Sequence, residues 1–161
     1  MNILEFAIKM ELAGEKYYNE QAEINEDNSL SKVFRMLAKD ENMHAMILEN
    51  KINKLAYELI KNETLSEAKS VFNNIEAITG GIKQIPDQLD AYKLALENEK
   101  ESITLYRKCL SEATLDESKR LFAYLLEQEE DHYAIIDQII SLIVRSEEWV
   151  ESAEFGVREE Y

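Results

Sequence analysis

The two halves of the chain repeat one helical pattern at an offset of 88 residues, and this duplication is the strongest constraint on the fold. Each half carries one of the chain's two histidines in the motif Glu-x-x-His, at Glu41 to His44 and at Glu129 to His132. The same offset pairs Glu11 with Glu99, Tyr18 with Tyr106, Val33 with Leu121, Phe34 with Phe122 and Leu37 with Leu125. The halves therefore resemble copies of one helical hairpin.

Helical periodicity and composition both favour an all-α fold. Apolar residues recur at helical spacing over residues 3–24, 30–61, 88–113 and 115–144, which predicts four long helices. The chain has only 4 Gly and 1 Pro, too few for a turn-rich all-β fold. The polar turn at 25–29 is short, and Thr114-Leu115-Asp116-Glu117 resembles a capping box at the start of the fourth helix.

Residues 62–87 form a much longer connection, which can carry the chain back along the bundle. The third long helix would then lie parallel to the second. Within the connection, Thr64-Leu65-Ser66-Glu67 predicts the start of one short helix, and Gly80-Gly81 predicts a break. We therefore expect residues 1–161 to form a single four-helix bundle with one crossover. A short C-terminal helix over 146–155 is expected to pack Trp149 and Phe155 on the bundle.

The overall charge narrows the possible partners and the location. The chain has 33 acidic and 18 basic side chains and a formal charge of −15, which argues against binding to nucleic acid. It lacks an apolar stretch long enough to span a membrane, and early charges such as Glu5 and Lys9 do not fit a signal peptide, so we expect a cytoplasmic protein. Cys109 stands alone, which leaves no internal disulfide, and we expect a buried, inert thiol.

The repeated Glu-x-x-His motif indicates a metal site, because residues three apart lie on one face of a helix. Two such hairpins packed face to face would bring four Glu and two His into the core. These groups offer two metal ions a mostly oxygen shell with one nitrogen each, which suits Fe or Mn better than Ca or structural Zn. The alternative, surface Glu residues and satisfied histidines, leaves two matching half-sites unexplained.

Four segments together resemble the rubrerythrin family, a branch of the ferritin-like di-iron carboxylate superfamily. They are Ala7-Ile8-Lys9-Met10-Glu11, Asp40-Glu41-Asn42-Met43-His44, Ala95-Leu96-Glu97-Asn98-Glu99 and Glu129-Glu130-Asp131-His132. The resemblance implies a ferritin-like bundle with two Fe ions per subunit, although the ligand set also admits Mn or Zn. It implies that Glu41 and Glu129 bridge the ions, that Glu11 and His44 complete one site, and that Glu99 and His132 complete the other.

The resemblance also implies supporting roles for residues around the ligands. Tyr18 and Tyr106 would lie beside the oxygen-binding face. Asp40 would hold the distant nitrogen of His132, and Gln128 would serve His44 in the same way. The alternatives are that both tyrosines are simply packed in the bundle and that Asp40 is a solvated helix residue.

Two departures from the family pattern bear on the expected activity. Rubrerythrins carry an additional Glu one turn after the third-helix ligand, and this chain has Ser102 there. We therefore expect a symmetric site in which His44 is a ligand in both redox states. Rubrerythrins also usually carry a rubredoxin domain with four iron-binding Cys, whereas these residues include one Cys. Electrons would come from a separate donor such as a rubredoxin or a reductase.

The function implied by the resemblance is reduction of hydrogen peroxide or dioxygen in defence against oxidative stress, by a protein expected to be a homodimer. One alternative is a ferritin-like or bacterioferritin-like ferroxidase that stores iron, which needs a hollow shell of many subunits. Another is a bundle in which the metal serves stability alone.

Overall fold

The computed structural model describes residues 1–77 and 88–159, with side chains described up to residue 75 and from 88 to 145. Its helices are α1 (Ile3–Ile24), α2 (Leu30–Ile52), α3 (Thr64–Ala77), α4 (Leu89–Glu112) and α5 (Asp116–Glu159). The all-α prediction is confirmed, and so is the short helix that begins at Thr64. The predicted break at Gly80-Gly81 lies outside the described residues.

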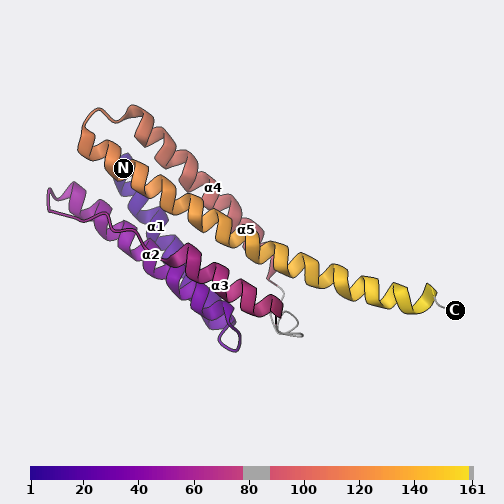
Figure 1. Ribbon diagram of the computed structural model, residues 1–161. Helices are drawn as coiled ribbons and strands as arrows, with labels where there is room; N and C mark the ends of the chain where they lie inside the picture. The colour runs from indigo at the N-terminus through magenta and orange to yellow at the C-terminus, as the bar shows by residue number, and fades with distance from the viewer. Residues whose placement is uncertain (78–87, 160–161) are drawn as a thin grey trace.

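The long helices form two antiparallel pairs, α1 with α2 and α4 with α5 (Figure 1). After α2 the chain returns along the bundle, and α3 packs against α2 and α5. As a result α4 runs parallel to α2, as the length of the connection predicts. Each pair supplies one Glu-x-x-His motif, so the fold brings the repeated halves face to face.

The second helix is shorter than predicted: it ends at Ile52 rather than near residue 61. The stop is a C-terminal cap in which Lys54 adopts a positive φ of 58°. The Lys54 N–H donates to the Lys51 carbonyl (3.2 Å), and the Leu55 N–H donates to the Asn50 carbonyl (2.8 Å), which is the pattern of a Schellman motif. Beyond it, Tyr57 and Leu59 continue the apolar spacing but pack on the core from a non-helical segment.

The last helix is longer than predicted: α5 runs without interruption from Asp116 to Glu159, where we expected a separate tail helix after residue 144. The reason is local, because no proline occurs in this stretch and the first glycine is Gly156. In Figure 1, α5 projects well past the other helices. The expected packing of Trp149 and Phe155 concerns side chains outside the described part of the structure.

The apolar core consists of two clusters. The first cluster contains the buried Tyr18, Val33, Phe34 and Leu37, together with residues of α3, α4 and the second half of α5. The second cluster contains their repeat partners, the buried Tyr106, Leu121, Phe122 and Leu125. The repeat is therefore also a pseudo-twofold relationship in space, since it exchanges the two clusters.

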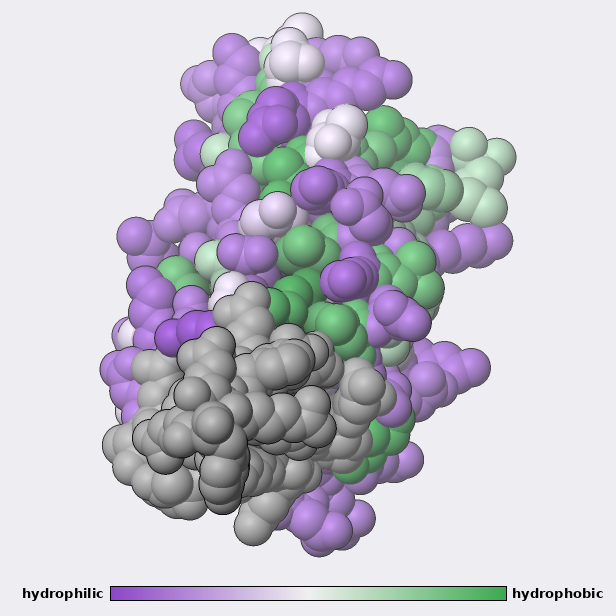
Figure 2. Space-filling model, turned by 90° about the vertical axis from the view of Figure 1, so that its right-hand side faces the viewer, coloured by the Kyte–Doolittle hydropathy of each residue, from purple (hydrophilic) through white to green (hydrophobic). Residues whose placement is uncertain are grey.

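Hydrophilic residues cover much of the surface, with apolar residues gathered near the middle of the face in Figure 2. This agrees with the strongly acidic composition. Among the described residues, no helix combines the length and apolar character that a membrane crossing requires.

Candidate metal centre

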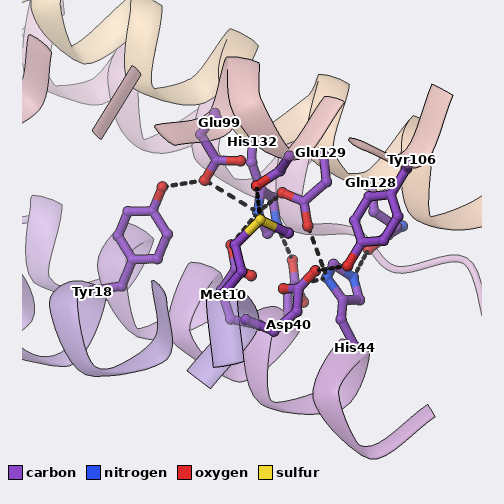
Figure 3. Close-up of polar contacts among 12 residues, drawn as sticks. Met10, Tyr18, Asp40, His44, Glu99, Tyr106, Gln128, Glu129 and His132 are labelled. Atoms are coloured by element: carbon purple, nitrogen blue, oxygen red, sulfur yellow. Dashed lines mark hydrogen bonds and ion pairs between the residues drawn. The ribbon is translucent and has the colours of Figure 1, made fainter. Parts of the chain in front are cut away.

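The six predicted ligand residues meet in the interior, one from each of α1 and α4 and two from each of α2 and α5 (Figure 3). None is more than 4% exposed. They form two groups in which ligand atoms lie within 4.8 Å of one another. One group is Glu11, Glu41, His44 and Glu129, and the other is Glu41, Glu99, Glu129 and His132. Glu41 and Glu129 belong to both groups.

Each histidine points its Nδ1 atom toward these carboxylates. His44 Nδ1 lies 3.3 Å from Glu11 Oε2 and 3.3 Å from Glu129 Oε1. His132 Nδ1 lies 3.0 Å from Glu41 Oε1, with Glu129 Oε2 at 3.6 Å and Glu99 Oε1 at 3.8 Å. The two Nδ1 atoms are thus the nitrogen donors that this arrangement offers to a metal pair.

The outward nitrogens are held as predicted. His132 Nε2 lies 3.0 Å from Asp40 Oδ2, and His44 Nε2 lies 3.1 Å from Gln128 Oε1. Both contacts cross from one helical pair to the other. Because Nε2 carries the hydrogen of each bond, the Nδ1 lone pair is left for a cation.

The two tyrosines also cross between the pairs. Tyr18 on α1 donates a hydrogen bond to Glu99 on α4, and Tyr106 on α4 donates to Glu11 on α1 at 2.5 Å. Both rings are buried. Their hydroxyl groups contact the carboxylates directly, so packing alone does not describe their role.

The buried carboxylates repel one another when no cation is present. Burial raises the pKa of Glu41 well above its usual range, and the nearby Glu11 and Glu129 raise it further. Burial and Glu129 likewise raise the pKa of Glu99. Burial opposes protonation of His132, but its hydrogen bond to Asp40 and the nearby carboxylates raise its pKa to about 9. Protons therefore take the place of cations in this cluster.

Three carboxylate oxygens test whether metal ions fit the cluster. Within the described residues, neither oxygen of Glu129 accepts a hydrogen bond, and neither does Glu99 Oε2, although all three atoms are buried. Unpaired buried oxygens are costly, and a divalent cation satisfies them directly. Four carboxylates also balance the charge of two such ions. The residues present therefore fit a pair of divalent metals.

A pocket of about 220 Å³ leads from the surface to this cluster between α1 and α4. Its walls include the exposed Ala13 and Glu101, and its floor includes Glu41 and Glu99. Gly14 also lines it and lies so close to Glu41 that an added Cβ would be 3.2 Å from Glu41 Cδ. A small molecule can approach the carboxylates here.

Sequence reasoning missed two residues of this pocket. Met10, expected as core filler, is half-buried and lines the pocket, where its Sδ accepts a hydrogen bond from Ser102 (3.3 Å). Ser102 Oγ also lies 3.1 Å from the carbonyl of Asn98 on its own helix. Gly14 is the other, and its position opposite Glu41 depends on how α1 meets α2. A glycine inside a helical pattern was the only available signal.

The fold and the buried cluster define the class: a ferritin-like helical bundle with a candidate two-metal carboxylate and histidine centre. Residues 2–140 match the family model described as Rubrerythrin, so the chain belongs to the rubrerythrin family. Comparison with curated proteins and with solved structures gave no match.

Proposed function

We propose that the protein is a di-iron oxidoreductase that reduces hydrogen peroxide or dioxygen with electrons from an external donor. The observation that carries the proposal is the pair of buried ligand groups sharing Glu41 and Glu129. The unpaired oxygens of Glu129 lie where a bridging carboxylate would need them. Iron is the metal proposed here, with Mn or Zn as the alternatives that the same donors admit.

What bound iron would supply is one electron from each ferrous ion, the two that conversion of hydrogen peroxide and two protons to two waters requires. The chain itself would hold both ions through Glu41 and Glu129 and one ion through each of the two histidines. The apolar clusters on either side limit access of water. The pocket between α1 and α4 admits a small oxidant.

Tyr18 and Tyr106 would act as fixed hydrogen-bond donors beside the reacting groups. Burial raises the pKa of Tyr18 well above its usual value, and the negative charge of Glu99 raises it further. Burial and Glu11 have the same effect on the pKa of Tyr106. Both phenols therefore keep their protons at neutral pH and orient the carboxylates of Glu99 and Glu11.

The direct test is reconstitution with ferrous iron under anaerobic conditions. We expect about two Fe per chain, followed by steady consumption of peroxide when NADH and a suitable reductase are supplied. Glu129→Gln, which removes the shared carboxylate, is expected to lose both properties. Iron uptake without peroxide or dioxygen consumption would instead support a bundle in which metal serves stability.

Ferroxidase activity with iron storage is the second candidate, because the ligand set is symmetric and Ser102 stands where a further Glu would break that symmetry. Storage needs a hollow shell of many subunits. Light scattering distinguishes the two proposals, since a dimer excludes the shell. The external donor is a separate protein in either scheme that reduces peroxide, because these residues contain a single cysteine.

A further inference from the structure

The two histidines have matching inner contacts but different outer partners. His132 Nε2 contacts a carboxylate, Asp40 Oδ2, at 3.0 Å. His44 Nε2 contacts a neutral amide, Gln128 Oε1, at 3.1 Å. Asp40 and Gln128 are equivalent positions of the 88-residue repeat, and both are buried, at 7% and 6% exposed. The symmetry of the ligands is therefore broken one layer outside them.

The crossover segment fixes the orientation of the amide. Asn62 donates from Nδ2 to Gln128 Oε1 at 2.7 Å, while its own Oδ1 accepts from the Thr64 N–H at 3.2 Å. Both ends of the Asn62 amide are thus committed, and its NH₂ group faces Gln128. The Gln128 carbonyl oxygen then accepts two hydrogen bonds, from Asn62 and from His44. The start of α3 consequently holds His44 with its Nδ1 turned inward.

The electrostatic difference between the halves follows from these partners. A hydrogen bond to a carboxylate is roughly twice as strong as one between neutral groups. It also places an additional negative charge beside the His132 imidazole, which makes that ring a stronger electron donor toward a cation. In the described residues, the ion pair of Asp40 is the one with His132. The His44 half has a neutral amide in the same place, already shared with Asn62.

We propose that the two metal positions are unequal, and that the position formed by Glu99 and His132 binds its divalent cation more tightly and fills first. Gln128, oriented by Asn62, keeps the Glu11 and His44 position weaker. Asp40, Gln128 and Asn62 are positioning residues in this scheme, acting through the imidazoles. The inference rests on the proposed two-metal site and adds an order of occupancy to it.

Titration of the metal-free protein with Co²⁺ alone, followed by visible absorption without oxygen, tests this order. Repulsion between two cations separates the binding steps even in a symmetric pair, so single-site variants are needed. Glu11→Gln weakens the His44 position and leaves the His132 position intact, and Glu99→Gln does the reverse. We expect the remaining site of Glu11→Gln to bind Co²⁺ at least about tenfold more tightly than that of Glu99→Gln.

Two isosteric substitutions then identify the cause. Asp40→Asn is expected to weaken the tighter step of the wild-type titration by about 10–100-fold, and Gln128→Glu to tighten the weaker step. Asn62→Ala releases the Gln128 amide and should affect the weaker step alone. Circular dichroism of each metal-free variant checks that it folds.

The outcomes separate this inference from the function on which it rests. Equal affinities of the two single-site variants, together with unchanged steps in Asp40→Asn and Gln128→Glu, would overturn the order of occupancy while leaving a two-metal site. Failure of the folded wild-type protein to bind two Co²⁺ would overturn the metal centre itself.

Discussion

The hydroxyl of Tyr106 on α4 donates a hydrogen bond of 2.5 Å to Glu11 on α1, across the bundle and next to the histidine of the neighbouring helix. Tyr18 makes the repeat-related contact with Glu99. These two bonds join the helical pairs at buried positions. Each phenol also takes one lone pair of a carboxylate that otherwise faces like charge.

Tyr106→Phe is expected to destabilise the metal-free protein by about 1–3 kcal/mol, because it leaves a buried Glu11 oxygen without its donor. Tyr18→Phe should have a similar effect through Glu99. Urea denaturation measures both changes. The control is Tyr124→Phe, whose hydroxyl donates to the Ile60 carbonyl at an exposed position and whose loss should cost less. Equal losses in all three variants would contradict a special role for the buried pair.

The stability of the metal-free protein should fall between pH 6 and pH 9. The pKa of His132 is raised to about 9 in the fold, so its contribution is complete below its ordinary value of 6.5 and disappears as pH rises through about 9. Burial and neighbouring carboxylates also raise the pKa of Glu41 and Glu99, and their contributions change in the same direction. Glu11 acts in the opposite direction, because its pKa is lowered to about 2, but only in acid.

Denaturation of the chelator-treated protein at several pH values measures this trend. Glu41→Gln is the control, since its amide cannot titrate and the decline should be smaller. Metal binding should become tighter over the same range, because cations displace these protons. A metal-free protein that gains stability from pH 6 to pH 9 would contradict the assigned protonation.

The sequence predicts the site better than it predicts the helix ends. The repeat at 88 residues identifies Glu11, Glu41 and their partners because metal chemistry requires particular side chains at a fixed spacing. Once the pairing is known, the contacts of Asp40 and Gln128 follow from their place before each bridging Glu. Each of these predictions depends on a side chain type that has few substitutes.

The end of α2 is different because its cap uses Lys54 in a left-handed conformation that glycine usually takes. The apolar spacing through Leu59 then continues past the true end of the helix. Asn62 was also missed, since its contact with Gln128 exists only because the crossover returns to α5 at this point. Such contacts depend on the path of the chain, which local patterns do not contain.

Gly14→Ala should separate metal affinity from stability. Alanine is favoured over glycine inside a helix by about 1 kcal/mol, so the metal-free protein should not be destabilised. The new Cβ would lie 3.2 Å from Glu41 Cδ and 3.4 Å from Oε2, and the Glu41 carboxylate must shift by a few tenths of an ångström to accommodate it. Because Glu41 belongs to both ligand groups, affinity for both cations should fall.

Calorimetry of the metal-free protein and Co²⁺ titration measure the two effects of Gly14→Ala. Ser102→Ala is the matched control, because Ser102 occupies the repeat-equivalent position on α4. Its hydroxyl contacts Met10 and its own helix, so its loss should leave metal affinity nearly unchanged. Wild-type affinity in Gly14→Ala would mean that Glu41 has room to move without cost to the site.

His44→Ala should lower metal content and the melting temperature of the reconstituted protein, as His132→Ala does, because each variant removes the sole nitrogen donor of its group. The position that could supply a replacement carboxylate is Ser102, whose hydroxyl already contacts the Asn98 carbonyl. Elemental analysis and thermal unfolding measure the two losses, and Met43→Ala, an exposed change on the same helix, is the control. If His44→Ala alone kept two metal ions per chain, the other ligands would suffice and the six-residue site would be wrong.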